Sequence, residues 1–389
     1  MYEVLLLLLP LAALWGWYAA RGGREKYRAR WVSKKLPAGY FKGISYLGSE
    51  QPDKAIETFI KVLEVDSDTV ETHLALGNLY RRRGEMDRAI RIHRNLIAWS
   101  TLRPDQRAEA MLELGRDYMS AGLLDRAEDL FRGLRDDQTH GVAALRQLIE
   151  IYEREKEWDS AIGAAARLEE TSSETLGPVI AHYYCEQAER YQRTQEPDRA
   201  LQAVHQALTL QPGSVRASLL KGDLLAQQGD WIGALDAYRR VEAQDGDFLP
   251  EAIPRVCTCL RRLGRIDDIK VFLDDLLQRY GGITAALALA EYEHQEHGEQ
   301  AAIRVLTEQL HRRPSLRGCQ RLLEIALPGT SGATQERLLI LKRLLTALLA
   351  ERPVYRCQHC GFPARSLHWQ CPGCRQWSSI RSIQGIEGE

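Results

Sequence analysis

The chain lacks an excess of charge of either sign. Its 389 residues include 52 Lys and Arg against 53 Asp and Glu, which leaves a formal net charge of −1. A protein without a strong overall field has no general attraction for nucleic acid, so nucleic acid is not expected among its partners. Aromatic residues make up 7% of the chain, and Gly and Pro occur in ordinary numbers. This composition does not indicate a disordered protein.

Motifs of catalysis are also missing. No Gly-rich phosphate loop follows a predicted strand, and no Gly-x-Ser-x-Gly elbow occurs. The histidines are spread along the chain, and only His294 and His297 have a spacing that metal ligands use. We interpret these two as a solvent-facing pair. The sequence therefore predicts a protein that is not an enzyme.

Cysteine is too sparse for a disulfide framework, with eight residues in 389. Four of the eight are scattered along predicted helices, where reduced thiols are expected. They are Cys185, Cys257, Cys259 and Cys319.

The other four cysteines form two closely spaced pairs near the end of the chain. Cys357-x-x-Cys360 is followed, after ten residues, by Cys371-x-x-Cys374. Two Cys-x-x-Cys turns at this distance are typical of a tetrahedral site with four thiolates. Gly361, after the first pair, and a second glycine, Gly373, inside the other pair suit turns that need a positive φ.

The spacing alone does not choose between zinc and a single iron. Four thiolates leave no open position, which disfavours hydrolytic catalysis. A structural site, an electron-transfer site and a zinc ribbon that binds nucleic acid remain. The last is disfavoured because no dense basic patch surrounds the cysteines. The two cysteine turns resemble those of rubredoxin.

An uncharged run of residues, Val4 to Ala20, opens the chain. It is just long enough to cross a bilayer, and Trp15, Trp17 and Tyr18 occur where an interfacial aromatic belt is expected. Positive charges follow this run rather than precede it, which disfavours a cleaved signal peptide. We predict a transmembrane anchor over residues 1–20 and a basic juxtamembrane segment over 21–35. The positive-inside rule places the N-terminus outside and the remainder in the cytoplasm.

Residues 36–351 contain a repeated pattern of small and large side chains. Leu76-Gly77-x-x-Tyr80 and Leu114-Gly115-x-x-Tyr118 are two examples, and Gly43 and Gly77 are 34 residues apart. The pattern resembles the tetratricopeptide repeat, whose period is 34 residues. About eight or nine helix pairs are expected to stack into a superhelix, since no pair buries its apolar face alone.

Small residues in each repeat are expected where two helices cross closely, with large residues beside them. Five further glycines are predicted to end the first helix of their pairs with a positive φ. They are Gly84, Gly122, Gly229, Gly264 and Gly298. The basic run Arg81-Arg82-Arg83 is interpreted as a solvated helix end, with a docking patch as the alternative.

The four-cysteine segment, residues 352–389, follows the repeats after a very short linker. We expect it to pack against the last repeats through apolar residues that could also form its own small core. They are Tyr355, Phe362, Trp369, Trp377 and Ile380. So small a module needs a metal for stability. The predicted fold class is therefore all-α: a tetratricopeptide-repeat superhelix with an N-terminal transmembrane helix and a small rubredoxin-like knob.

Three longer stretches point to one family. They are Gly77–His93, Leu114–Leu130 and the two cysteine turns with the tail Trp377–Ile386. Together with the order of anchor, repeats and knob, they resemble the lipopolysaccharide assembly protein B family of Gram-negative bacteria. The resemblance implies a single-pass inner-membrane adaptor with a periplasmic N-terminus. It implies one iron ion at Cys357, Cys360, Cys371 and Cys374, with zinc as the alternative.

The same resemblance implies the partners. The adaptor would promote degradation of the lipid A pathway deacetylase by the membrane-anchored AAA+ protease, and so limit lipopolysaccharide synthesis. It would also gather other lipopolysaccharide synthesis or transport proteins. Two alternatives remain from the residues themselves: a rubredoxin-type electron-transfer module on a repeat scaffold, and a repeat groove that binds a short peptide tail.

Overall fold

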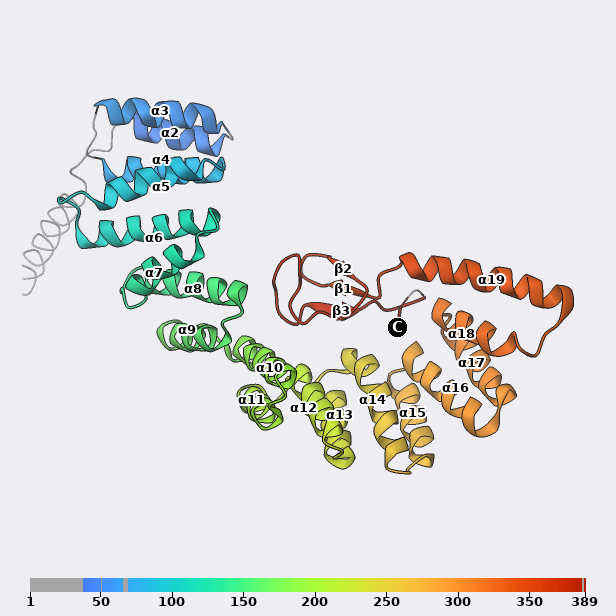
Figure 1. The fold of residues 1–389 in the computed structure, drawn as a ribbon. Helices are drawn as coiled ribbons and strands as arrows, with labels where there is room; N and C mark the ends of the chain where they lie inside the picture. The colour runs from blue at the N-terminus through green and yellow to red at the C-terminus, as the bar shows by residue number, and fades with distance from the viewer. Residues whose placement is uncertain (1–37, 50, 66–68, 387) are drawn as a thin grey trace, which may run out of the picture. The chain divides into compact units, whose positions relative to one another are not determined.

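The computed structural model describes residues 38–49, 51–65, 69–386 and 388–389 (Figure 1). The described residues up to Ile151 and those from Tyr152 onward form two compact units, and the division falls within helix α8. The predicted anchor and basic segment lie outside the described residues.

Antiparallel helix pairs make up the first unit. Neighbouring helices pack as α2 with α3, α4 with α5, and α6 with α7, and each pair packs on the next. The helices are α2 (Ala38–Gly48), α3 (Pro52–Val65), α4 (Val70–Arg82), α5 (Met86–Ile97), α6 (Pro104–Ser120), α7 (Leu124–Leu134) and α8 (Gly141–Glu155).

Helix pairs continue through the second unit. They are α9 (Trp158–Thr171), α10 (Gly177–Arg193), α11 (Pro197–Leu210), α12 (Val215–Gln227), α13 (Trp231–Gln244), η1 (Gly246–Phe248), α14 (Leu249–Arg262), α15 (Asp267–Arg279), α16 (Ile283–His297), α17 (Glu299–Arg312), α18 (Leu316–Ala326) and α19 (Gly332–Glu351). One apolar core runs from α12 to α16, and two side chains of the four-cysteine knob, Leu367 and Trp369, pack against it.

Glycines allow the two helices of a repeat to approach closely, as the sequence predicts. A Cβ added at Gly115 would lie 2.5 Å from the ring of Phe131, and one at Gly222 would lie 2.3 Å from the ring of Tyr238. The same contact joins Gly77 to the His93 ring. Each glycine meets the large residue of its own repeat, which explains why the two residue types recur together.

The turn glycines also have the predicted backbone. Gly84, Gly122, Gly229, Gly264 and Gly298 have φ between 71° and 84°. Two other helix pairs use residues with a side chain at the equivalent turn. Lys156 and Gln195 have φ of 59° and 60°. The turn between the two helices of a repeat therefore adopts a positive φ even at positions where the sequence has no glycine.

The four-cysteine knob is a small antiparallel sheet with long loops. Its strands are β1 (Tyr355–Cys357), β2 (Pro363–Ala364) and β3 (Ile380–Ser382), in the order β2-β1-β3. Tyr355 pairs with Ala364 on one side and with Ser382 on the other. The chain is thus mostly helical, and the all-α prediction omitted this sheet because its strands are too short to leave a periodic pattern.

Candidate metal centre

Each Cys-x-x-Cys pair lies on a tight turn, and the two turns close alike. The Gly361 N–H donates to the carbonyl oxygen of Cys357 over 3.0 Å, and the Arg375 N–H donates to that of Cys371 over 2.8 Å. Gly361 has φ of 79°, as predicted, but Arg375 takes the left-handed position of the second turn with φ of 58°. The prediction for Gly373 was therefore wrong, because the left-handed residue follows the second cysteine of each pair.

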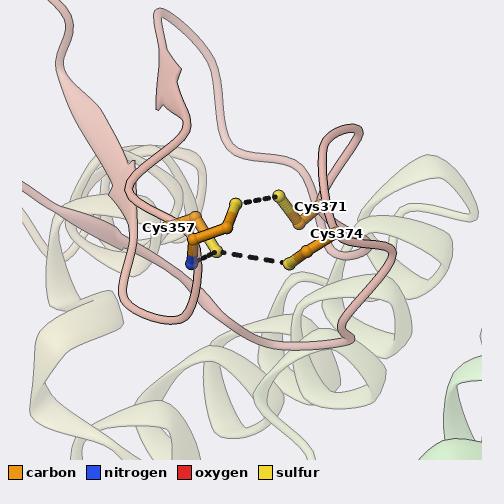
Figure 2. A group of neighbouring side chains, drawn as sticks. Cys357, Cys371 and Cys374 are labelled. Atoms are coloured by element: carbon orange, nitrogen blue, oxygen red, sulfur yellow. Dashed lines mark hydrogen bonds between the residues drawn. The ribbon is translucent and has the colours of Figure 1, made fainter. Parts of the chain in front are cut away.

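The four sulfur atoms converge on one point between the turns (Figure 2). All lie within 4.8 Å of one another. The Sγ atoms of Cys357 and Cys374 are 3.7 Å apart, as are those of Cys360 and Cys371. These distances are far longer than a disulfide bond of about 2.05 Å.

This sulfur cage has the size that a tetrahedral metal requires. With metal–sulfur bonds of about 2.3 Å, tetrahedral geometry separates neighbouring sulfurs by about 3.8 Å. The two 3.7 Å separations meet that requirement. Cys357 and Cys371 are 1% exposed, whereas Cys360 is exposed and Cys374 half-buried. The cage can therefore hold zinc or iron, with one edge toward solvent.

Polar groups around Cys357 favour its thiolate form. Its sulfur lies 3.3 Å from the Ser379 hydroxyl and 3.5 Å from the backbone nitrogen of Cys360. The Ser379 hydroxyl, with the backbone N–H groups of Cys360 and His359, lowers the pKa of the Cys357 thiol to about 5 against the opposing effect of burial. A thiolate is the form that binds a metal.

The knob is fixed to the repeats through one carboxylate. Glu153, near the end of α8, accepts hydrogen bonds from Trp377 Nε1 at 2.9 Å and from Gln370 Nε2 at 3.1 Å, both in the knob. It also accepts a bond of 2.7 Å from the Tyr183 hydroxyl on α10. The Trp377 ring stacks on His182, with centroids 4.8 Å apart, and His182 Nε2 lies 2.7 Å from Ser378 Oγ.

A buried arginine lies beneath the two tryptophans of the knob. The Arg216 side chain on α12 is 2% exposed and pairs with Glu186 at 2.7 Å and Glu189 at 2.6 Å. Its guanidinium lies 5.8 Å from the Trp377 ring centre and 6.0 Å from that of Trp369. The two tryptophan rings therefore cover the buried charge of Arg216. Cation–π attraction between the guanidinium and these rings stabilises the docked position of the knob.

The other side of the knob contacts η1 and α14. Trp369 stacks on Phe248, with centroids 5.2 Å apart, and Arg381 lies over the same Phe248 ring at 4.3 Å. Arg381 also pairs with Asp245 at 3.0 Å. The Tyr355 hydroxyl donates to Glu251 on α14. Together these contacts extend the docked surface from α8 to α14.

The tail after the sheet reaches the later repeats. The Leu316 N–H, at the start of α18, donates to the carbonyl oxygen of Ile386 over 2.9 Å. The Glu389 side chain accepts a bond of 3.1 Å from the Thr284 N–H on α16 and pairs with Arg317 at 3.0 Å.

The knob docks on the repeats, as predicted. Its tail reaches α16 and α18 among the last repeats, but Trp369 and Trp377 contact repeats in the middle of the chain. Phe362 and Ile380 pack inside the knob, beside the buried cysteines. No pattern in the sequence indicates the contact sites on the repeats, Glu153 and Arg216, because charged residues on helices are usually solvated.

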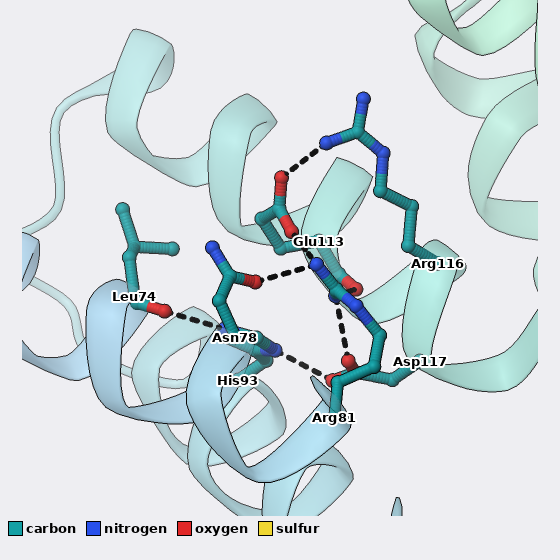
Figure 3. Close-up of polar contacts among 7 residues, drawn as sticks. All are labelled: Leu74, Asn78, Arg81, His93, Glu113, Arg116 and Asp117. Carbon is teal, nitrogen blue, oxygen red and sulfur yellow. Dashed lines mark hydrogen bonds and ion pairs between the residues drawn. The ribbon is translucent and has the colours of Figure 1, made fainter. Parts of the chain in front are cut away.

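A second buried polar cluster lies in the first unit (Figure 3). Arg81 donates to Asp117 at 2.8 Å and to Glu113 at 2.6 Å, both on α6. Asp117 and His93 have fully buried side chains, and their facing atoms are 2.5 Å apart. Arg81 is therefore a link between repeats. The prediction of a solvated helix end holds for Arg82, which is exposed, whereas the exposed Arg83 pairs with Asp53 on α3 at 2.5 Å.

The four scattered cysteines are free thiols at helical positions, as predicted. Burial raises the pKa of Cys185 to about 12 and that of Cys257 to about 11, and it also raises the pKa of Cys259. Thiols held in this form are poor metal ligands and poor nucleophiles.

Comparison with known proteins supports each part of this description. Residues 355–382 match the family described as the rubredoxin metal binding domain. Residues 72–108, 112–174 and 185–247 match tetratricopeptide repeat families. The chain is 38% identical over 389 residues to lipopolysaccharide assembly protein B of Escherichia coli (strain K12), covering 100% of both chains. It is 34% identical over 399 residues to the protein of that name from Haemophilus influenzae, again over the full length of both.

The chain belongs to the lipopolysaccharide assembly protein B family. Membership of this family and the tetratricopeptide repeats make it a non-enzymatic scaffold protein, as the sequence predicted. Its knob is the metal-binding domain of the family.

Solved repeat structures resemble this member of the lipopolysaccharide assembly protein B family only distantly. The Naa15/Naa10 complex bound to HypK-THB has a TM-score of 0.44 at 14% identity, over 82% of this chain and 51% of that chain. The MamA protein has a TM-score of 0.32 at 23% identity, over 47% of this chain and 95% of its own.

In the part of the chain that the structure describes, no helix is long and apolar enough to cross a membrane.

Proposed function

We propose that this chain is an inner-membrane adaptor that regulates lipopolysaccharide assembly. The observation that carries the proposal is the identity of 38% over the full length of a protein named for lipopolysaccharide assembly. The tetratricopeptide repeats support it, because stacked helix pairs present extended surfaces for protein partners.

The proposed partners are the membrane-anchored AAA+ protease and the lipid A pathway deacetylase. The adaptor would bring the deacetylase to the protease, and it would also gather other lipopolysaccharide synthesis or transport proteins. A transmembrane helix over residues 1–20, with the N-terminus in the periplasm, would confine the adaptor to the membrane of the protease. Confinement raises the effective concentration of the partners without any new contact.

The role of the metal in this proposal is structural. Cys357, Cys360, Cys371 and Cys374 would hold one iron ion, with zinc as the alternative, and the metal would stabilise the folded knob. Within this chain, the folded knob holds Trp369 and Trp377 against the repeats. Loss of the metal would therefore expose the surface of α10 and α12 that these side chains cover.

The direct test is the lifetime of the deacetylase in cells depleted of this protein. We expect its half-life to lengthen several-fold after depletion and to return to normal when the full chain is supplied. A chain without residues 1–20 should fail to restore it. An unchanged half-life after depletion would rule out the proteolytic role, and full activity without residues 1–20 would rule out the anchor.

Electron transfer is the second candidate, and the exposure of Cys360 at one edge of the sulfur cage favours it. Electron carriers need such an edge near the surface. This candidate requires iron with a reversible redox couple in protein purified without added metal. Stoichiometric zinc in that preparation would exclude it.

A further inference from the structure

A groove crosses the first helices of three successive repeats, α14, α16 and α18, which lie side by side (Figure 1). We call it the α14–α18 groove. Its volume is about 550 Å³, within the range of about 300–1,000 Å³ that is typical of ligand sites. Each of the three helices contributes a polar residue that the argument below uses: Arg261 on α14, Thr284 on α16 and Arg317 on α18.

The charged residues that line this groove are more often positive than negative. The positive ones are Arg261, Arg317 and Arg321, and the negative ones are Glu291 and Glu324. Both carboxylates pair with Arg321. Arg261 and Arg317 are therefore the charges that a ligand in the groove would meet, and they favour an acidic ligand.

One acidic side chain already lies at the edge of the groove. Glu389 accepts a hydrogen bond of 3.1 Å from the Thr284 N–H, in the first turn of α16, and another from the Thr284 hydroxyl. It also pairs with Arg317 at 3.0 Å, and its side chain is only 5% exposed. A helix N-terminus, a hydroxyl and a guanidinium that converge on one carboxylate form a site suited to that group.

Much of the tail that carries this carboxylate is exposed. Gln384, Gly385 and Ile386 are exposed, and the backbone contact of Ile386 with the repeats is the 2.9 Å hydrogen bond from the Leu316 N–H. Another ligand that supplies a carboxylate can replace Glu389, because it recovers the buried polar contacts. The tail has the advantage of its covalent attachment, which gives it an effective concentration of roughly millimolar order.

We propose that the α14–α18 groove binds an acidic segment of a partner protein, and that Glu389 is an internal competitor for it. A carboxylate of the partner replaces that of Glu389 at Thr284 and Arg317, and a second carboxylate pairs with Arg261. The tail is then a strap that leaves the groove edge when the partner binds. This inference goes beyond the adaptor function proposed above, because it assigns a binding site and the chemistry of its ligand.

Binding of an acidic peptide to the detergent-solubilised full chain, purified with its metal, tests the proposal. The probe is a dye-labelled peptide with the sequence of residues 382–389 and an amidated end, so that its carboxylates are two glutamate side chains. In Glu389→Gln the internal competitor is weakened, and we expect the peptide to bind at least about tenfold more tightly than to the wild type in fluorescence polarisation. A peptide with glutamine in place of both glutamates should bind neither chain at about millimolar concentration.

Variants of the groove arginines, made in the Glu389→Gln chain, locate the peptide. Arg317→Gln should weaken binding at least about tenfold, because it removes a charge-assisted contact with the carboxylate. Arg261→Gln should weaken it about threefold or more, and Arg261 is exposed, so this change leaves the fold intact. Arg199→Gln is the matched control. Arg199 is an arginine on α11 whose side chain is 65% exposed and pairs with Glu196, and its loss should leave the affinity unchanged.

Four results would overturn the proposal. The first is no binding of the acidic peptide to Glu389→Gln at about millimolar concentration. The second is equal affinity for Glu389→Gln and the wild type, since Glu389 would then not compete. The third is an affinity that neither Arg317→Gln nor Arg261→Gln changes. The fourth is displacement of the peptide by an equal concentration of inorganic phosphate, which would indicate a general anion site.

This test is separate from that of the adaptor function. Peptide binding is measured on the purified chain, whereas the adaptor function is measured by the half-life of the deacetylase in cells. Failure of the peptide to bind would refute the groove and leave the adaptor function standing. An unchanged half-life would refute the proteolytic role and leave the peptide result as it is.

Discussion

Replacing Glu153 with alanine should loosen the knob from the repeats. The carboxylate accepts hydrogen bonds from Trp377 Nε1 at 2.9 Å and from Gln370 Nε2 at 3.1 Å. A hydrogen bond to a charged acceptor contributes about 1.5–3 kcal/mol. Because Glu153 is only half-buried and both bonds end on the two oxygens of a single carboxylate, we expect Glu153→Ala to lower the docking free energy by about 3 kcal/mol.

Hydrogen exchange of β3 measures this loss. Unfolding of the docked knob requires loss of its contacts with the repeats, so the opening free energy of β3 includes the docking term. A decrease of about 3 kcal/mol should speed exchange of the β3 amides about 100-fold. Exchange in α6 and α7, which lie in the other unit, should not change.

Glu170→Ala is the matched control. Glu170 is an exposed glutamate on α9 whose partner is Arg167 at 3.4 Å, and its side chain is 68% exposed. Loss of such a surface pair changes stability by less than about 1 kcal/mol. Exchange of β3 in Glu153→Ala that stays within threefold of the wild type, or that matches Glu170→Ala, would refute the docking role of Glu153.

Three further predictions concern packing, pH and the metal. Gly222→Ala should lower the free energy of unfolding by about 1–3 kcal/mol, because the new methyl group would overlap the facing aromatic ring. Gly163→Ala, at a helical position with open space around it, should raise stability by up to about 1 kcal/mol, and thermal melts of the two variants should shift in opposite directions. Burial, with a smaller effect of a nearby arginine, lowers the pKa of His182 from 6.5 to about 3. As the pH drops below 6.5, His182 therefore takes up a proton in the unfolded chain but not in the folded one, and the stability of the folded state falls. Between pH 6.5 and pH 5 the wild type should lose about 2 kcal/mol more than His182→Gln in denaturant titrations, and equal slopes would contradict this reasoning. Cys371→Ser should release the metal and remove exchange protection from β3, whereas Cys319→Ser should change neither; metal retained in Cys371→Ser would show that the site needs only three thiolates.

The docked tryptophans link the metal centre to the repeats physically. Trp377 and the second cysteine turn belong to one loop, and Ser378, next to Trp377, contacts His182. Only two residues separate Cys374 from Trp377, so the second cysteine turn lies close along the chain to the contacts with α10.

The sequence determined the local features of this protein. Spacing of the cysteines predicted that the sulfurs would converge, and the structure places them within 4.8 Å of one another. The recurrence of glycine with a large residue predicted the close helix crossings at Gly115 and Gly222. Such features are predictable because they depend on residues near one another in the chain, whose geometry the backbone restricts.

Only the tertiary structure decided the long-range contacts. Glu153 and Trp377 are 224 positions apart, and no pattern in either segment indicates that they meet. Arg81 and Arg216 look like solvated charges in the sequence, and each becomes a buried or half-buried ion pair only when a neighbouring repeat supplies carboxylates. The physical reason is that burial of a charge depends on what packs over it, and in a repeat protein that neighbour is set by the stacking of whole helices.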